Sequence, residues 1–329
     1  MLNKELNLSS NIFQPNIEEK PTRAGFGEGL LELGLENKNV ISLCADLKDS
    51  TYNYLFAEKF PDRFFEVGVA EQNMATVAAG LGISGKIVFI SSYATFSPGR
   101  NWEQIRTTIA YNDSNVKIAG HHAGILTGPD GATHQATEDI AIMRVLPNMK
   151  VVVPVDAIEA KKATIFAGHI WGPVYLRFQR EKTPILTTEQ TPFVLGKIEI
   201  FWQSKKPEVL IIGAGPVLYN ALWAAHDLEK EKIGSIVVNC HTIKPLDKKI
   251  IDLSKKCKAV VTVEEHQING GLGGAVAEML ASKYPVPIEF VGLQDVFGES
   301  GRPKDLISKY GLDVFDIKIA VKKVIKRKK

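Results

Sequence analysis

The loop at residues 120–135 is the most unusual stretch of this chain. Its three histidines (His121, His122 and His134) and Asp130 lie among glycines, directly after the apolar run at 116–119. A long loop of this kind is often functional. The histidine spacing allows a metal site, and a carboxylate beside imidazoles suits a polyhydroxy substrate equally well. The third possibility is that these loop residues have no functional role.

Glu71 begins a second candidate segment, because small apolar residues follow it at helical spacing, including Met74, Ala75 and Ala78. An acidic residue at the start of a helix is normally a favourable partner of the helix dipole. The sharper interpretation is that Glu71 is partly desolvated and keeps its proton near neutral pH. It would then serve as a proton donor or hydrogen-bond donor.

Two aromatic residues and three arginines follow other predicted strand ends or precede a helix. Tyr93 and Phe96 come after the run at 86–91, where they either join the core or clamp a flat heterocycle beyond the strand ends. Arg23 precedes a helix, and Arg177 and Arg180 follow a strand. Single arginines are usually surface residues, but at strand–loop junctions they commonly bind phosphate.

Two glycine-rich segments resemble dinucleotide-binding loops but are incomplete. Gly213-Ala214-Gly215 and Gly271-Leu272-Gly273 each lie between a predicted strand and a helix, yet Leu218 and Val276 stand where a third glycine is needed. No acidic residue closes a ribose site at the end of the next strand. We therefore favour tight strand–helix packing over nucleotide binding.

The elements that must position these residues alternate regularly between strand and helix. Short β-branched runs are predicted strands at 40–44, 86–91, 116–119, 150–155, 174–178, 208–213, 235–239, 259–263 and 288–291. Helical patterns lie at 25–36, 70–82, 102–110, 157–167, 218–229, 248–256, 271–282 and 303–309. This order predicts an α/β fold of two doubly wound domains with mostly parallel sheets. We expect an N-terminal extension at 1–20 and domains at 21–190 and 193–329.

Composition narrows the possible partners. The 329 residues include 40 basic and 37 acidic ones, for a formal net charge of +3, so we expect no nucleic-acid partner. Residues 1–20 lack an apolar signal core, and no uninterrupted run of about 18 apolar residues occurs, so we expect no membrane partner and a cytoplasmic location. The lysine-rich residues 318–329 are expected to be a solvated helix end, and a nucleic-acid or membrane tail is the alternative. The three cysteines show no metal spacing and are expected to be buried thiols.

Taken together, these features resemble the C-terminal half of transketolases over nearly the whole chain from residue 21. The motifs occur in the family's order: Arg23 with Gly25, Cys44-Ala45-Asp46-Leu47, Val69-Ala70-Glu71-Gln72-Asn73-Met74, Asp130-Gly131-Ala132-Thr133-His134-Gln135 and Val263-Glu264-Glu265-His266. The Gly-Asp-Gly…Asn magnesium motif of the family's diphosphate domain is not found. The chain therefore looks like a separate section made of a pyrimidine-binding domain and a C-terminal domain.

The resemblance implies roles for individual residues. Glu71 matches the glutamate that hydrogen-bonds the aminopyrimidine of thiamine diphosphate, and Tyr93 and Phe96 match the aromatic residues that pack on this ring. His134 matches the histidine beside the reacting sugar carbons, and Asp130 the aspartate that binds the C2 hydroxyl of the acceptor. Four further positions match sugar-phosphate contacts: Arg23, Ser50, His122 and Arg180. Asp46 falls in the family's subunit-interface segment, and His266 is expected in the core or an interface.

The implied protein is the C-terminal subunit of a two-chain transketolase. It would transfer a two-carbon ketol unit between phosphorylated ketose and aldose, with thiamine diphosphate across the interface and the Mg²⁺ ligands on an N-terminal partner chain. No metal ligand is expected in this chain, and two such pairs would form a heterotetramer. The alternatives are a 1-deoxyxylulose-5-phosphate synthase, a 2-oxoacid dehydrogenase beta subunit, or a non-catalytic binding protein.

Overall fold

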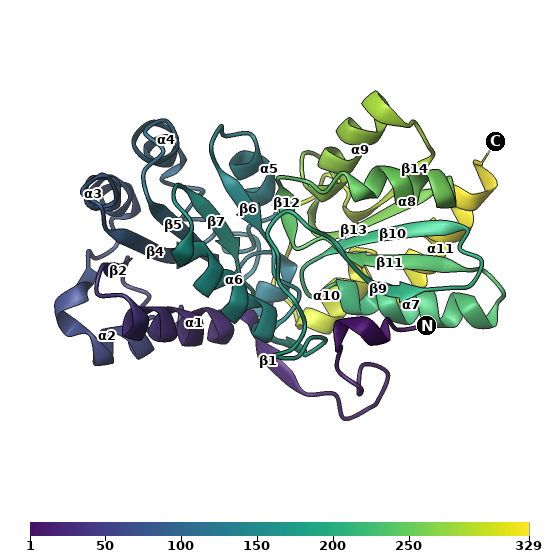
Figure 1. The fold of residues 1–329 in the computed structure, drawn as a ribbon, viewed down its shortest axis with the longest axis horizontal. Coiled ribbons are helices and arrows are strands. Elements are labelled where there is room, and N and C mark those ends of the chain that lie inside the picture. Colours follow the sequence, from purple (N-terminus) through teal and green to yellow (C-terminus); the bar gives the residue numbers. More distant parts are fainter. Residues whose placement is uncertain (329) are drawn as a thin grey trace.

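The predicted strands assemble into two main sheets that lie next to one another in the elongated molecule (Figure 1). The computed structural model describes residues 1–328, so the predicted lysine-rich end includes one position, Lys329, that lies outside the described residues. A third, two-stranded antiparallel sheet pairs β1 (Glu19–Pro21) with β8 (Lys182–Pro184) and so joins the start of the first domain to its end.

The first sheet has seven strands in the order β12-β6-β7-β5-β4-β2-β3. Its strands are β2 (Val40–Cys44), β3 (Phe64–Glu66), β4 (Ile87–Tyr93), β5 (Val116–His121), β6 (Lys150–Val152), β7 (Val174–Arg177) and β12 (Thr242–Lys244). All neighbours are parallel except β12 and β6. β2 and β5 are buried along their whole length, as expected for parallel strands covered on both faces.

Helices cover both faces of this sheet. On one face, α1 (Thr22–Glu36) and α6 (Ala157–His169) pack against each other and against Phe89 and Leu176. On the other face lie α3 (Glu71–Ile83), α4 (Trp102–Gln104), the π-helix η3 (Ile105–Ala110) and α5 (Asp139–Arg144). The short elements α2 (Tyr54–Lys59), η2 (Pro61–Arg63) and η4 (Ile125–Asp130) complete this domain.

The second sheet has five strands in the order β14-β13-β10-β11-β9. These are β9 (Glu199–Gln203), β10 (Val209–Ala214), β11 (Ser235–Asn239), β13 (Val260–Gln267) and β14 (Ile288–Leu293), and only β9 is antiparallel to its neighbour. Its helices are α7 (Leu218–Lys230), α8 (Lys249–Cys257), α9 (Leu272–Lys283), α10 (Pro303–Lys309) and α11 (Val314–Lys326). The predicted α/β class with mostly parallel sheets is therefore confirmed.

The two domains are more closely joined than their sequence pattern indicates. β12 belongs to the second domain by sequence but forms the antiparallel edge of the first sheet. The N-terminal segment, which includes η1 (Lys4–Leu6), packs on the second domain: Ile12 is fully buried there, and the Phe13 ring lies edge-on to Trp202 at 5.8 Å. Segments distant in the chain thus stabilise each domain.

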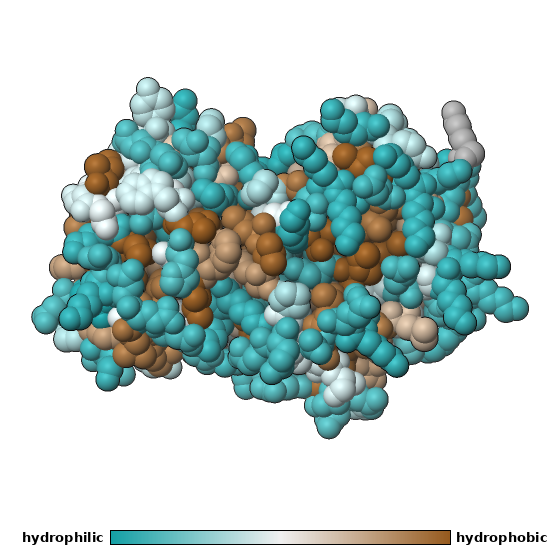
Figure 2. Space-filling model, viewed as in Figure 1, coloured by the Kyte–Doolittle hydropathy of each residue, from teal (hydrophilic) through white to brown (hydrophobic). Residues whose placement is uncertain are grey.

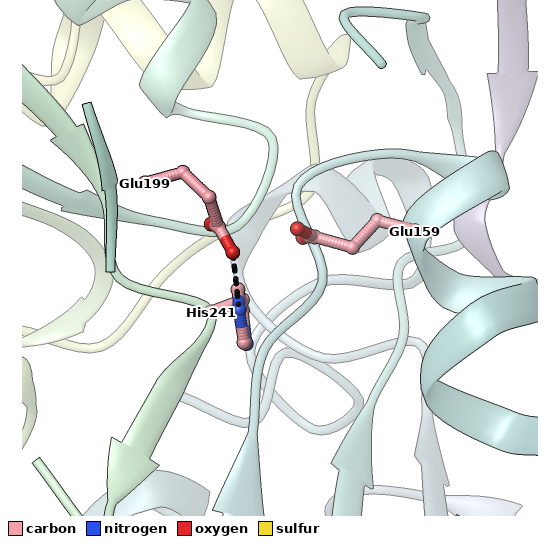
Figure 3. A group of neighbouring side chains, drawn as sticks. All are labelled: Glu159, Glu199 and His241. Carbon is pink, nitrogen blue, oxygen red and sulfur yellow. Dashed lines mark hydrogen bonds and ion pairs between the residues drawn. The ribbon is translucent and has the colours of Figure 1, made fainter. Parts of the chain in front are cut away.

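A buried polar cluster also crosses the domain boundary (Figure 3). Glu199 of β9 and His241 lie on the second domain, 3.0 Å apart, and Glu159 reaches them from α6 of the first. The amide of Asn239 donates to both carboxylates, at 2.7 Å to Glu159 and 3.3 Å to Glu199. Every ligand-type atom of this trio already has a hydrogen-bond partner within the protein, including the bond of Thr242 to the second ring nitrogen.

The glycine-rich segments serve strand–helix packing. A Cβ at Gly213 would lie 2.5 Å from Leu218, the first residue of α7. At the start of α9, the amides of Leu272 and Gly273 both donate to the Glu264 carboxylate at 2.7 Å. This carboxylate occupies the position at the helix N-terminus where a bound phosphate would lie. The packing interpretation of both segments is confirmed.

The surface shown in Figure 2 mixes hydrophilic side chains with patches of apolar ones. Several exposed apolar residues belong to α3 or its neighbours, namely Phe65, Val69, Val77 and Ile83. Within residues 1–328, no helix combines the length and apolar character needed to cross a membrane. Cys44, Cys240 and Cys257 are buried free thiols, as predicted, and burial raises the pKa of Cys44 to about 12.

Candidate functional site

The carboxyl ends of β4 and β5 bring the aromatic and histidine candidates together. The rings of Tyr93 and His122 are stacked at 3.8 Å between centroids, and Phe96 lies 6.0 Å from Tyr93 in a nearly parallel orientation. His134 meets both aromatic rings edge-on, at 6.0 Å from Tyr93 and 5.4 Å from Phe96. Adjacent parallel strands end at the same edge of a sheet, so residues separated by about forty positions share one site.

Glu71 is the first residue of α3 and is only 2% exposed. Its carboxylate pairs with Arg100 at 2.8 Å and accepts a longer hydrogen bond from Ser92 at 3.4 Å. The side chain of Asn101 donates to the Glu71 carbonyl at 3.0 Å. The structure thus pairs Glu71 with a cation, and its role as a proton or hydrogen-bond donor stays a prediction.

Sequence reasoning missed Ser92, Arg100 and Asn101. Arg100 lies four residues after Phe96, and its guanidinium group stands 4.5 Å from the centre of that ring. Arginine at this spacing after an aromatic residue could have indicated a cation–π contact, but not its acidic partner twenty-nine residues away.

A second part of the site is rich in positive charge. Arg23 donates to the carbonyls of Ser50 at 2.7 Å and Arg180 at 3.0 Å. Arg180 donates to the Thr127 carbonyl at 2.9 Å and lies 3.5 Å from the Asp130 carboxylate. The structure thus links four predicted phosphate- or sugar-binding residues through one pair of guanidinium groups.

His122 lies at the junction of the aromatic and the cationic parts. Burial lowers its pKa to about 3, and the nearby charges of Arg23 and Arg180 act in the same direction. His122 is therefore a neutral imidazole at physiological pH. His134, which is less buried, has its Nδ1 within 2.8 Å of the Thr133 hydroxyl, so its Nε2 is free to bind a hydroxyl group.

The structure does not bring the three loop histidines together as metal ligands. His121 turns into the core between Phe26 and Phe178, where burial lowers its pKa well below the usual range. Among residues 1–328, the only trio with ligand atoms close enough to share an ion is Glu159, Glu199 and His241. The metal interpretation of the loop is therefore not supported.

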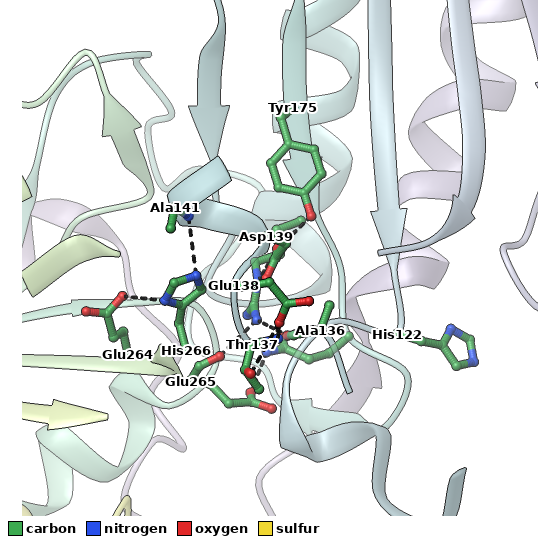
Figure 4. Close-up of polar contacts among 12 residues, drawn as sticks. His122, Ala136, Thr137, Glu138, Asp139, Ala141, Tyr175, Glu264, Glu265 and His266 are labelled. Carbon is green, nitrogen blue, oxygen red and sulfur yellow. Dashed lines mark hydrogen bonds and ion pairs between the residues drawn. The ribbon is translucent and has the colours of Figure 1, made fainter. Parts of the chain in front are cut away.

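Part of the loop is regular, since residues 125–130 form the 3₁₀ helix η4, interrupted at Gly128. One further expectation is corrected. Arg177 is not a phosphate ligand: it is buried, pairs with Asp139 at 2.8 Å, and donates to the Ala136 carbonyl at 3.3 Å. Asp139 also accepts from the Tyr175 hydroxyl at 2.6 Å (Figure 4).

His266 lies in the interface between the domains, as predicted. Figure 4 shows it on the second domain, facing Ala141 of α5. The Ala141 amide donates to its Nε2 at 3.3 Å, so its Nδ1 is left to donate to the Gln267 carbonyl at 2.7 Å. Both ring nitrogens are thereby used for structure.

These features fit a flat heterocyclic group that needs a carboxylate partner. Tyr93 and Phe96 offer parallel ring faces. The Glu71 carboxylate, which has one weakly bonded oxygen, is linked to Phe96 through Arg100. Buried polar atoms without a hydrogen-bond partner also occur near these strand ends, including Ser91 Oγ, Thr95 Oγ1 and His122 Nδ1.

Comparison with known proteins assigns the family. The transketolase pyrimidine-binding domain matches residues 18–185, and the transketolase C-terminal domain matches residues 196–317. The chain belongs to the transketolase family.

Within this family, the chain corresponds to the C-terminal section. It is 47% identical over 297 residues to a protein of Methanocaldococcus jannaschii described as a transketolase C-terminal section, covering 89% of this chain and 93% of that protein. It is also similar to a solved split-gene transketolase, described as an inactive beta4 tetramer, with a TM-score of 0.87, 45% identity and coverage of 94% and 99%. It matches the transketolase of Rattus norvegicus at 37% identity but spans only 49% of that protein.

Proposed function

We propose that this chain is the C-terminal subunit of a two-chain, thiamine-diphosphate-dependent transketolase. The observation that carries the proposal is the continuity of the site. One chain of contacts runs from Glu71 through Arg100 and Phe96 to the Tyr93–His122 stack. It continues from His122 through Thr127 to Arg180 and Arg23. Such an arrangement suits a heterocyclic cofactor at one end and an anionic sugar at the other. The reaction is reversible transfer of a two-carbon ketol unit between phosphorylated ketose and aldose, within pentose phosphate metabolism in the cytoplasm.

Glu71, Tyr93 and Phe96 are the residues that would hold the cofactor. Thiamine diphosphate, when bound, supplies the electron sink for breaking the carbon–carbon bond beside a carbonyl group. The buried Glu71 carboxyl group would bond to the heterocyclic ring of the cofactor, and Ser92 and Arg100 orient that group. The aromatic rings exclude water from one side of the site.

The other candidates act on the sugar. His134 presents its Nε2 to the hydroxyl groups near the reacting carbons, since its Nδ1 is bonded to Thr133. Asp130 accepts a hydrogen bond from the C2 hydroxyl of the acceptor. Arg23 and Arg180 bind the terminal phosphate, with His122 and Ser50 at its sides.

We propose that α3 and its neighbours dock on an N-terminal subunit that carries the Mg²⁺ ligands. Val69 and Val77 flank Glu71 in sequence and are 70% and 41% exposed, although Glu71 itself is buried. Apolar residues exposed next to a buried carboxylate suit a protein interface. Two chains of each kind would form a heterotetramer. The description of the split-gene relative as an inactive beta4 tetramer supports a requirement for the second chain.

The nature of the terminal anion deserves its own test. A relative from Clostridium sp., 38% identical over 96% of this chain, is named as a subunit of a 6-deoxy-6-sulfo-D-fructose transketolase. Phosphate and sulfonate are both bound by guanidinium groups, so the Arg23–Arg180 pair suits either. We expect phosphate to be preferred, and comparison of fructose 6-phosphate with 6-deoxy-6-sulfofructose as ketol donors checks this expectation.

The decisive experiment mixes this chain with its N-terminal partner, thiamine diphosphate and Mg²⁺. Ketol transfer from xylulose 5-phosphate to ribose 5-phosphate is followed, with each chain alone as the control. We expect activity in the mixture only. If the assembled complex transfers no ketol unit but consumes pyruvate, the result would instead indicate a 1-deoxyxylulose-5-phosphate synthase or a 2-oxoacid dehydrogenase. A complex that consumes neither kind of donor would leave only a binding role.

A further inference from the structure

Glu265 is a carboxylate of the second domain whose side chain bonds to the first. It lies near the end of β13 and is 2% exposed. One oxygen accepts a hydrogen bond from the Leu126 amide at 2.6 Å, and the other accepts from the Gln179 side chain at 2.6 Å. A single carboxylate thereby connects two separate segments of the first domain.

Both segments carry candidate substrate ligands. Leu126 lies in η4, between His122 and Asp130. Gln179 directly precedes Arg180. The backbone N–H of Gln179 donates to the hydroxyl of Thr22 at 2.7 Å, and Thr22 directly precedes Arg23. The positions of the predicted phosphate-binding residues and of the sugar-binding loop are therefore linked through Glu265.

The surrounding residues are built around this carboxylate. A Cβ at Gly124 would lie 2.3 Å from the Glu265 Oε1 atom, and Gly124 has a φ of +79°, so only glycine allows the loop to approach this closely. Arg177 donates to the Glu265 carbonyl at 2.8 Å and also to the Ala136 carbonyl. Both ends of the 122–136 segment are thus held by contacts with this part of β13.

The hydrogen bonds of Glu265 to Leu126 and Gln179 depend on the charge of the Glu265 carboxylate. Burial raises the pKa of Glu265 to about 7, and the nearby Arg177 guanidinium acts in the opposite direction. Asp139 is the other charged group acting on Glu265, and it raises the pKa further. Two donors directed at one carboxylate are satisfied best when it is ionised.

We propose that Glu265 is a positioning residue through which the second domain holds the substrate-binding loop and the Arg23–Arg180 pair in place. The proposal rests on the proposed function for the identity of the substrate. It gives the second domain a part in substrate binding, beyond assembly and stability. Glu265 does not itself contact the substrate.

The first test measures amide hydrogen exchange in Glu265→Leu, which removes both acceptors, and in Glu265→Gln, which keeps one. We expect peptides covering 122–130 and 177–182 to exchange about 10- to 100-fold faster in Glu265→Leu, and less so in Glu265→Gln. Glu264→Gln is the matched control, because the Glu264 carboxylate bonds to the start of α9 and lies 3.9 Å from His266, but has no bond to Leu126 or Gln179. Unchanged exchange in both Glu265 variants would overturn the proposal. If the leucine variant does not fold, the glutamine variant decides.

The second test uses the assembled two-chain protein. We expect Glu265→Gln to raise KM for the phosphorylated aldose about 3- to 10-fold while kcat changes less. We also expect KM of the wild type to change more below pH 7 than KM of the variant, because only the wild type has an ionisable group at this position. A kcat decrease without a change in KM would contradict a positioning role. If the wild-type assembly does not transfer ketol units, the proposed function fails. The exchange data then still decide whether Glu265 holds the loop, and calorimetric titration with ribose 5-phosphate decides whether the loop binds sugar phosphate.

Discussion

At the residue scale, His122 stays neutral because burial and two neighbouring guanidinium groups oppose its protonation. With its pKa lowered to about 3, it remains an uncharged ring from about pH 5 upwards. It can therefore stack on Tyr93 and accept a hydrogen bond without repelling Arg23 or Arg180. The positive charge of the site comes from the two arginines.

Replacing Arg180 tests this division of roles. Arg180→Met removes one guanidinium group but keeps a long apolar side chain. We expect KM for phosphorylated sugars to rise about 10- to 100-fold, the range for a lost charged hydrogen bond, with a smaller change in kcat. Steady-state kinetics of the assembled protein gives both constants. An unchanged KM would remove Arg180 from the phosphate site.

Glu71 is predicted to matter for turnover and not for folding. We expect Glu71→Ala to lower kcat about 100- to 10,000-fold in the presence of the partner, the usual range for loss of a proton-transferring group. Circular dichroism should remain that of the wild type. Glu58→Gln, which alters an exposed carboxylate on α2, is the matched control. Wild-type rates in Glu71→Ala would refute the assigned role.

Sequence reasoning identified the chemical groups of the site better than their supports. Tyr93, His122 and His134 could be predicted because they follow strands that end at one sheet edge. Arg100 and Glu265 could not, because their importance lies in contacts with residues 29 and 139 positions away. Arg177 was misjudged because a buried ion pair leaves no local signature in the sequence.

At the element scale, the close approach of α1 to α6 orients Arg23 at the edge of the site. A Cβ at Gly25 would lie 1.9 Å from the Ala157 carbonyl, and one at Gly29 would lie 2.7 Å from that of Lys161. The two helices therefore touch backbone to backbone. This contact explains why glycines are tolerated in a helix that they would otherwise destabilise.

Two glycine substitutions separate packing from helix propensity. We expect Gly25→Ala to lower the free energy of unfolding by about 1–3 kcal/mol, because the added methyl group overlaps α6. Gly80→Ala is the matched control: it is an exposed helical position with no atom within 4 Å of the added Cβ. We expect it to raise stability by about 0.4–1 kcal/mol. Denaturant unfolding of both variants measures the difference, and equal effects would contradict the packing account.

The longer elements could be predicted because their apolar pattern is continuous. The strands at 40–44 and 235–239 match the structure residue for residue, and most helices differ by only a few residues at their ends. Several short elements were missed, among them β3, β8, β12 and α5, because each of these has three to six residues and depends on tertiary contacts. The helix predicted at 102–110 exists, but most of it is the π-helix η3, which apolar spacing does not distinguish from an α-helix.

At the scale of the whole molecule, Glu159, Glu199 and His241 make the domain contact sensitive to pH. Burial raises the pKa of both carboxyl groups to about 8 and lowers that of His241. A carboxyl group with a raised folded-state pKa holds a proton that the unfolded chain has lost. Stability from these two groups is therefore greatest below about pH 4.5 and declines as the pH rises towards 8.

Glu199→Gln tests this linkage. The amide keeps the shape of Glu199 and can still bond to His241 and Asn239, but it cannot ionise. We expect the wild type to lose about 1–2 kcal/mol more unfolding free energy than the variant between pH 6 and pH 8. Urea unfolding at both pH values measures this, with Glu58→Gln as the control. Parallel losses in wild type and Glu199→Gln would show that Glu199 does not ionise in this range.

The central claim is that half of a catalytic site lies in this chain and the other half in a partner. The most direct measurement titrates a fixed amount of this chain with the N-terminal subunit, in excess thiamine diphosphate and Mg²⁺, and follows ketol transfer. We predict no transfer without the partner and a rate that rises to a plateau at one partner per chain. Ketol transfer by this chain alone, or no transfer at any ratio in a confirmed complex, would contradict it.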